Sequence, residues 1–429
     1  MRFRRMNSRM PNEKALPKEE GVDHTLSLLK EGYLFLANRR NTLNSKVVET
    51  RVLGKKAICL SGKEAAELFY DNKKFIRHGV VPERVIQTLF GKGGVQGLDG
   101  EEHTHRKKMF MSVMTKERLQ QLADITGQQF AMAVDKWRSQ EQVVLFEEMQ
   151  LLLTKVACEW AGVPLSKDQI QKLSKDLTSL FETPAAVGPR NWGGRMSRNR
   201  IEKSLIDLVE AIREEKVTVS ADSILSIFAT HRDLDNHLLD KNVVAVEILN
   251  ILRPIVAVSI FVNFLALALH NYPEDRKKLE TGDPAYAQMF IQELRRFYPF
   301  FPFTGATTKE SFTWKGYDFE EGTLTLLDLY GTNHDPDEWE NPDKFLPERF
   351  KDWKESPFSF IPQGGGDFVM GHRCAGEWAT VEILKVCLDY LVNKLTYTMP
   401  PQDLSYSMSD IPSIPKSKII LTNVESKKG

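Results

Sequence analysis

A long apolar stretch containing one arginine-proline pair constrains the fold of this chain most. Residues 243–269 are almost entirely apolar, and the pair Arg253-Pro254 stands near their middle. A helix that is apolar on every side must be buried on every side. We therefore expect a helix over residues 241–271 at the centre of a large core. Pro254 removes one backbone donor, so a kink is expected beside the arginine.

Arg253 needs an explanation, because a guanidinium remains charged and its burial without an anionic partner is costly. One interpretation is a site for an external anion at the kink of the helix. The other is an internal salt bridge, for example to Glu247 on the same helix. This segment alone leaves both interpretations open.

The composition excludes several classes of protein. The 429 residues contain 58 basic and 58 acidic side chains, a balance that gives no reason to expect nucleic acid or an acidic membrane as partner. The uncharged part of the apolar stretch, residues 254–269, is shorter than the ~20 residues that span a bilayer. Residues 1–10 are basic but lack the apolar stretch of a signal peptide. We expect a cytoplasmic protein without a membrane span and with a flexible basic tail over residues 1–20.

Residues 21–429 are expected to form a single, mainly α domain with a minor β lobe, since no long linker or internal repeat divides them. Helical patterns occupy roughly 23–37, 62–70, 83–90, 101–137, 143–161, 167–183, 198–215, 221–231, 241–271, 284–298 and 377–394. The β predictions are a hairpin within 50–60, a second hairpin formed by 312–319 and 322–329, and a last strand over 416–424.

One of the four cysteines differs from the rest. Cys374 lies in the Gly-rich, basic turn 371–376, immediately before a helix that starts near Glu377. A helix start and adjacent cations favour a thiolate, which is a nucleophile or a metal ligand. The other three lie in apolar patterns and are expected to be small buried hydrophobes: Cys59, Cys158 and Cys387.

Two clusters precede the cysteine turn. Glu293-Leu-Arg-Arg296 places a carboxylate and a guanidinium at i and i+3 on one helix face, and Phe345-Leu-Pro-Glu-Arg-Phe350 supplies Arg349. The order is ExxR, a β hairpin, PERF, a Gly-rich loop with one cysteine, then a helix. This series resembles the cytochrome P450 haem-thiolate fold over nearly the whole chain. The resemblance implies a mainly α protein with a large helical lobe and a small β-rich lobe.

The resemblance also implies a cofactor, haem b, with Cys374 as its axial ligand. A thiolate opposite the oxygen site donates electron density and favours O–O cleavage. Glu293, Arg296 and Arg349 are expected to interact and to support the cysteine loop. Three further residues resemble positions that hold the haem, the first two at its propionates: Arg77, His103 and His372.

The cysteine loop departs from the usual sequence motif of the family at two positions. Asp367 stands where the family has Phe, and Met370 where it has Gly, whereas Ala375 and Gly376 match. The sequence of residues 361–378 is similar to the cysteine loop of the bacterial fatty-acid peroxygenases. That branch hydroxylates or decarboxylates fatty acids with hydrogen peroxide, which implies that no redox partner protein is required.

Within this resemblance, Arg253 acquires a role. The central helix of ordinary members carries an acid–alcohol pair that delivers protons, whereas this chain has Asn250-Ile-Leu-Arg-Pro254. The carboxylate of a long-chain fatty acid would pair with Arg253 and act as general acid–base on peroxide. Because the head group is held near the iron, Cα and Cβ are the carbons expected to react. Arg253, Pro254 and Gln96 are the predicted catalytic residues.

Gln96 separates the two activities of the branch, because the decarboxylating member has His at the matching position. Gln predicts mainly 2- or 3-hydroxy acids, with terminal alkenes as a minor product. An apolar pocket is expected to include Phe90, Phe300, Phe301 and Phe303, although ordinary core packing explains them equally well. The alternatives are an alkene-forming decarboxylase, a dioxygen-dependent monooxygenase with redox partners, and a non-enzymatic haem-thiolate sensor.

Overall fold

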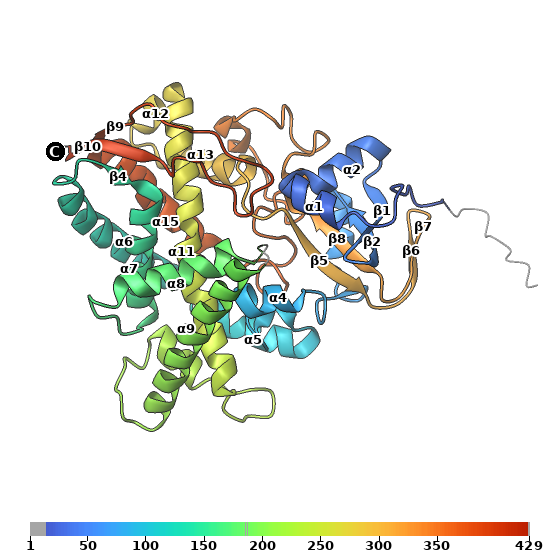
Figure 1. Cartoon of the computed structure of the whole chain (residues 1–429), viewed down its shortest axis with the longest axis horizontal. Coiled ribbons are helices and arrows are strands. Elements are labelled where there is room, and N and C mark those ends of the chain that lie inside the picture. The colour runs from blue at the N-terminus through green and yellow to red at the C-terminus, as the bar shows by residue number, and fades with distance from the viewer. Residues whose placement is uncertain (1–13, 185, 187, 428–429) are drawn as a thin grey trace, which may run out of the picture.

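The central helix α11 (Lys241–Asn271) runs through the helical part of the molecule (Figure 1). A computed structural model describes residues 14–184, 186 and 188–427 of the chain. The bounds of α11 are those predicted from the apolar stretch, and the side chain of Asp240 accepts the N–H groups of Asn242 and Val243 at its start. The helix continues through Pro254 as one element of 31 residues, so the expected kink does not break it.

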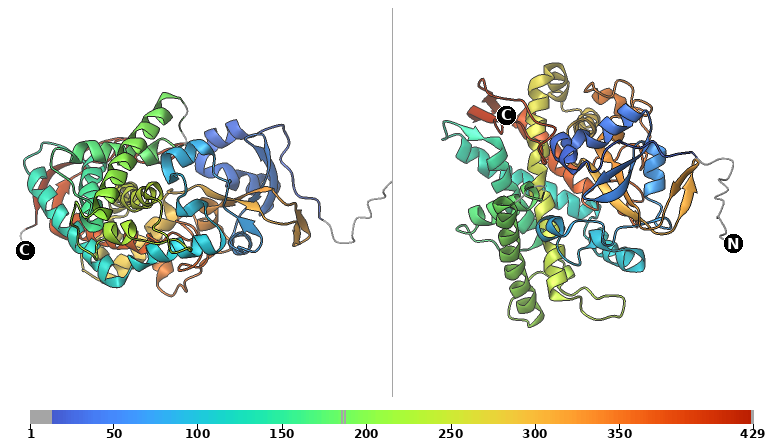
Figure 2. Two further views of the ribbon diagram at one scale, coloured as in Figure 1. Left: turned by 90° about the horizontal axis from the view of Figure 1, so that it is seen from below. Right: turned by 45° about the vertical axis from the view of Figure 1, so that its right-hand side comes forward.

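The helix α11 is buried by its neighbours. It packs against α7 (Leu145–Ala161), α9 (Pro189–Arg213), α8 (Ile170–Glu182) and α15 (Glu377–Asp389). By length and composition it could cross a membrane, but 94% of its most apolar window is buried inside the protein. Figure 2 shows it nearly end-on, with other helices around it. It is the core helix of a soluble fold, as the sequence predicted.

The other helices are distributed along the described chain between strands and loops. In chain order they are α1 (Thr25–Glu31), η1 (Gly32–Leu34), α2 (Phe35–Leu43), α3 (Lys63–Phe69), α4 (Glu83–Val85), η2 (Ile86–Phe90), η3 (Val95–Gly97), α5 (Gly100–Ser112), α6 (Lys116–Trp137), α10 (Ile224–Ala229), α12 (Pro273–Leu279), α13 (Pro284–Phe297), α14 (Leu329–Asn333), η4 (Pro347–Phe350) and η5 (Tyr390–Lys394).

A smaller lobe lies to the right in Figure 1, where α1 and α2 accompany the largest sheet. This sheet has the strand order β1-β2-β8-β5-β3, in which only β2 and β8 are parallel. A second sheet has the order β4-β10-β9, and β6 pairs with β7. The strands are β1 (Val47–Val52), β2 (Lys55–Leu60), β3 (Phe75–Ile76), β4 (Val143–Val144), β5 (Phe303–Thr308), β6 (Phe312–Trp314), β7 (Tyr317–Phe319), β8 (Leu324–Asp328), β9 (Leu395–Thr398) and β10 (Ile420–Ser426).

The second predicted hairpin was wrong. The chain turns at Lys315-Gly316, both with positive φ, so that β6 pairs with β7. The strand β8, which was expected to complete the hairpin, instead lies between β2 and β5. It is buried along most of its length, as in a central strand, and alternation alone could not distinguish these two pairings.

Other predicted boundaries also differ, and α9 begins at Pro189, nine residues before the predicted start at residue 198. The pattern over 101–137 is two helices, α5 and α6, because the hydroxyl of Thr115 accepts the N–H of Arg118 and starts a new helix. Of the flexible tail predicted over residues 1–20, residues 1–13 lie outside the described residues. Residues 14–20 are held by the β lobe, since Glu19 N–H donates to the Glu49 carbonyl at 2.9 Å and Glu49 N–H donates to Pro17 at 2.8 Å.

Candidate active site

The loop that ends at Cys374 leads directly into α15. Cys374 is half-buried, whereas Cys59, Cys158 and Cys387 are buried as predicted. Burial raises the pKa of the Cys374 thiol, and the ammonium of Lys107 opposes this effect most strongly. The positive charge that favours the thiolate form of Cys374 therefore comes mainly from Lys107 on α5. It does not come mainly from the cations next to Cys374 in the sequence, as was predicted.

The adjacent cations are occupied elsewhere. Arg373 donates to Glu377 at 2.7 Å and to Glu355 at 2.8 Å, while Arg295 binds the other oxygen of Glu377. Burial and the nearby Arg77 lower the pKa of His372 to about 2, so its imidazole is neutral. The Arg295–Glu377–Arg373 cluster, which sequence reasoning missed, instead anchors the cysteine loop to α13 and α15.

Asp367 and Met370, the two residues that differ from the usual loop motif, belong to one turn. A side-chain oxygen of Asp367 accepts the N–H of Val369 at 2.9 Å and the N–H of Met370 at 2.5 Å. The glycines before this turn allow close packing, since a Cβ on Gly365 would lie 2.4 Å from the Pro357 carbonyl oxygen. The side chain of Asp367 thus shapes the turn that precedes Cys374.

The structure brings Glu293, Arg296 and Arg349 together, as predicted from ExxR and PERF. Arg296 binds Glu293 through two bonds of 2.7 and 2.8 Å, and Arg349 Nε lies 3.0 Å from the same carboxylate. Glu293 also accepts the N–H of Leu346 at 2.8 Å. Glu293 and Arg296 are fully buried, so this cluster ties α13 to the PERF segment.

The predicted cofactor residues gather beside the cysteine loop. His103 and His372 stack with ring centroids 3.8 Å apart. Arg77 is buried, and its Nη1 has no partner within the described part of the chain. The nearby carboxylate of Asp99 is already engaged by the N–H groups of Arg77 and His78. Lys107, which sequence reasoning missed, is also buried and donates to the Arg373 carbonyl.

This donor set fits the propionates of a haem. Arg77 and Lys107 are buried cations without a bound carboxylate among the residues described, and an anionic group would offset the cost of burying them. Burial and the neighbouring Lys107 lower the pKa of His103 to about 4, so its imidazole is neutral and can offer an N–H to a propionate. The i,i+4 spacing of His103 and Lys107 is the sequence signal that could have found the lysine.

Arg77→Gln is expected to weaken haem retention while leaving the fold intact. Loss of one charge-assisted hydrogen bond costs ~1.5–3 kcal/mol, or roughly a 10- to 100-fold faster haem loss. The rate can be measured by transfer of haem to an excess of an acceptor apoprotein. Arg138→Gln is the matched control, because Arg138 is exposed and pairs with Glu425. An unchanged rate in Arg77→Gln would contradict the assignment.

Arg253 is buried in α11, with 5% of its surface exposed, and no carboxylate of the described chain lies within salt-bridge distance of it. Its Nη1 donates to the Leu89 carbonyl and its Nη2 to Asn250 at 3.3 Å. Burial lowers the pKa of Arg253 to about 9, and the charge of Cys374 is near enough to oppose this shift. The guanidinium is still protonated at pH 7, so a cation without a carboxylate partner in the described chain lies on α11, which packs against α15, the helix that follows Cys374.

The alternative partner of Arg253, Glu247, is bound elsewhere. Glu247 accepts from Arg106 at 2.8 Å and from Asn250 Nδ2 at 2.9 Å. Asn250 also donates to Gln96 Oε1 at 3.3 Å. The structure therefore links Gln96 to Arg253 through Asn250, a residue that sequence reasoning had not placed in the site.

The predicted aromatic residues do not form one group. Phe90 lies near Arg253, whose guanidinium carbon is 5.8 Å from the ring centroid. Phe300 stacks on Phe261 of α11 with centroids 4.3 Å apart, and the exposed Phe301 packs edge-on against Phe300. Phe303, at the start of β5, packs against a cluster of the β lobe instead. Its role in lining a pocket remains a prediction.

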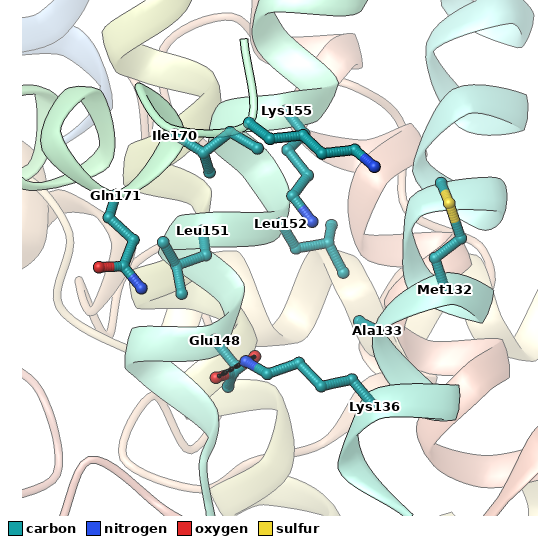
Figure 3. A pocket seen from close by; sticks show the side chains of 10 residues that line it. Met132, Ala133, Lys136, Glu148, Leu151, Leu152, Lys155, Ile170 and Gln171 are labelled. Atoms are coloured by element: carbon teal, nitrogen blue, oxygen red, sulfur yellow. Dashed lines mark hydrogen bonds and ion pairs between the residues drawn. The ribbon is translucent and has the colours of Figure 1, made fainter. Parts of the chain in front are cut away.

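A surface hollow of about 220 Å³ lies apart from this site, between α6, α7 and α8 (Figure 3). In Figure 3, Lys136 reaches across its edge to Glu148, and the two groups are 2.7 Å apart. None of the predicted site residues lines the hollow.

The fold and the cysteine site define a protein class, that of haem proteins ligated by cysteine. The sequence model of cytochrome P450 matches residues 276–421. Cytochrome P450EX alpha (CYP152N1), solved with myristic acid, is 50% identical, with a TM-score of 0.94, and the match covers 96% of this chain and 100% of that one. A variant of cytochrome P450SP alpha (CYP152B1) is 42% identical, with a TM-score of 0.93, and 95% and 100% are covered.

A third relative, a variant of cytochrome P450 OleT solved with arachidonic acid, is 36% identical with a TM-score of 0.94. The match covers 97% of this chain and 100% of that chain. The chain belongs to the cytochrome P450 family, and its solved relatives at 42–50% identity are CYP152 enzymes. The cofactor of this family is haem b ligated by a cysteine thiolate, as the sequence predicted.

Proposed function

We propose that this protein is a peroxygenase that hydroxylates long-chain fatty acids at Cα or Cβ with hydrogen peroxide and forms some terminal alkene. The observation that carries the proposal is the buried Arg253, a cation without a carboxylate partner in the described chain, on the helix α11 that packs against α15, the helix that follows Cys374. The relatives solved with myristic and arachidonic acid support a fatty acid as the substrate.

Arg253 would bind the fatty-acid carboxylate, and the pairing would offset the cost of burying its charge. Asn250 holds one side of the guanidinium and thereby orients it. The bound carboxylate can accept a proton from hydrogen peroxide at one oxygen and return it, which replaces the missing acid–alcohol pair. The haem, ligated by Cys374, would supply the oxidising chemistry. Cα and Cβ react because they lie closest to the fixed head group.

The proposal is tested by product analysis with saturated fatty acids of graded length and peroxide alone. We expect 2- and 3-hydroxy acids without NADPH or redox proteins, and no product from the fatty alcohols of the same length. If turnover required dioxygen and an electron-transfer partner, the protein would be a conventional monooxygenase. If fatty acids neither shifted the haem spectrum nor reacted, a sensor would be the better assignment. We also propose a cytoplasmic location, which suits the balanced charge.

Gln96→His is expected to raise the alkene fraction without abolishing hydroxylation. Gln96 already bonds to Asn250, so an imidazole there could donate a proton beside the bound carboxylate, whereas the amide offers only neutral hydrogen bonds. The measurement is chromatography of the products of one fatty acid, with both proteins at equal turnover. Alkene as the main product of the unsubstituted protein would overturn the role assigned to Gln96.

A further inference from the structure

A second buried arginine, Arg198 of α9, meets Arg253 at a shared acceptor. Arg198 Nη1 donates to the carbonyls of Thr88 and Leu89, both at 3.1 Å, and the Leu89 carbonyl also accepts from Arg253. These carbonyls lie in the last turn of η2, where no helical partner is available. The two arginines, far apart in the sequence, therefore satisfy the same helix end.

Arg198 is rigidly held. It is only 2% exposed, and its Nε donates to Glu202 at 2.6 Å. The turn after η2 packs closely on it, since a Cβ on Gly91 would lie 2.1 Å from Arg198 Nη2. Gly91 also has a φ of +83°, so glycine suits this turn for two reasons.

The shared acceptor matters because a carboxylate that binds both Nη groups of Arg253 competes with the Leu89 carbonyl for Nη1. A buried carbonyl left without a donor is costly, but the Leu89 oxygen has two lone pairs and would keep its bond to Arg198. The charge of Arg198 is also, after burial, the main cause that lowers the pKa of Arg253. An anion placed at Arg253 would relieve this repulsion between two cations.

We propose that Arg198 is a positioning residue for substrate binding: it retains the Leu89 carbonyl, so that Arg253 is released to the fatty-acid carboxylate without leaving a buried acceptor unpaired. This inference rests on the proposed function of Arg253. It adds that α9 and the turn after η2 determine how strongly the carboxylate is held.

The test compares the affinity of the haem-loaded protein for myristic acid with its affinity for 4-phenylimidazole, an uncharged ligand of haem iron, by calorimetry and by spectral titration. Arg198→Gln is expected to weaken myristic acid binding roughly tenfold, the cost of one unpaired buried carbonyl, and to leave phenylimidazole binding unchanged. Arg198→Lys should show an intermediate loss, since an ammonium can still donate to the carbonyls. If Arg198→Gln does not fold, the affinities of Arg198→Lys for the two ligands are compared instead.

Arg200→Gln is the matched control, because Arg200 lies on the same helix but is exposed and pairs with Asp176. It should bind both ligands normally. The double variant with Arg253→Gln should bind myristic acid no more weakly than Arg253→Gln alone, because Arg198 acts through Arg253.

Additive losses in the double variant, equal losses for both ligands, or normal myristic acid binding by Arg198→Gln would each overturn the inference. The failure of the proposed function is distinguishable, because it would appear as normal myristic acid binding by Arg253→Gln itself. A weakened Arg253→Gln together with an unchanged Arg198→Gln would overturn only the role of Arg198.

Discussion

Cys374→Ser is expected to abolish the thiolate-type carbonyl spectrum of the reduced haem protein and all peroxide-driven turnover. Cys374 alone among the four cysteines lies in the turn before α15, within reach of the charges of Lys107 and Arg295. A serine hydroxyl is a much weaker donor of electron density than a thiolate. The measurement is the difference spectrum of the carbon monoxide complex, together with the haem content of the purified variant.

The control is Cys158→Ala, which removes a fully buried thiol in α7 far from this turn in the sequence. It should keep the thiolate-type spectrum, although its thermal stability can fall because a small cavity is created. Substitutions at Cys59 and Cys387 should likewise leave the spectrum intact. A thiolate-type spectrum retained by Cys374→Ser would show that another residue ligates the iron.

Arg253→Ala should lose fatty-acid binding and peroxide-driven turnover while still holding haem. Removal of one partner of a buried charge pair costs ~2–5 kcal/mol, or roughly 30-fold or more in affinity. The reason lies in the structure: Arg253 is buried in the central helix α11, and no carboxylate of the described chain neutralises its charge. Affinity is measured by the spectral shift on titration with a fatty acid, and turnover by the hydroxy acids formed.

A short carboxylic acid added to the unsubstituted protein provides the control for mechanism. Bound at Arg253, it should support peroxide-dependent oxidation of a substrate that has no acid group, because the added carboxylate performs the proton transfer. Arg253→Ala should gain little from this addition at concentrations that saturate the parent protein. Near-normal fatty-acid turnover by Arg253→Ala would show that the salt bridge does not form.

Several parts of the fold could be predicted from consecutive residues. The bounds of α11 follow from a stretch that is apolar all round and from Asp240, which caps its start. The approach of Glu293, Arg296 and Arg349 could be predicted from two short motifs. The pairing of β8 could not, because a strand buried on both faces gives no alternation that identifies its neighbours.

Some residues of the site could likewise be predicted from the sequence, and others could not. Cys374 and Arg253 were predicted as site residues because one lies in a motif and the other breaks a pattern, and Gln96 was predicted from the resemblance to the fatty-acid peroxygenases. Lys107 and Arg198 were not, because buried cations have no local signature and their acceptors lie 266 and 109 residues away. Their burial and their partners depend on how α5 and α9 pack, which no window of the sequence contains.

Arg253 shows most clearly what the sequence could predict and what required the tertiary structure. The sequence by itself determined that a guanidinium is buried within an apolar helix and that it needs an anion, since side-chain chemistry and helical periodicity are local properties. It left Glu247 and an external carboxylate equally open as partners. Only the tertiary structure excluded Glu247, because Arg106 of α5, which is 141 residues before Glu247 in the sequence, lies against α11 and pairs with the carboxylate of Glu247. Arg253 is therefore left without a carboxylate partner in the described chain, and an external carboxylate is the partner that we propose.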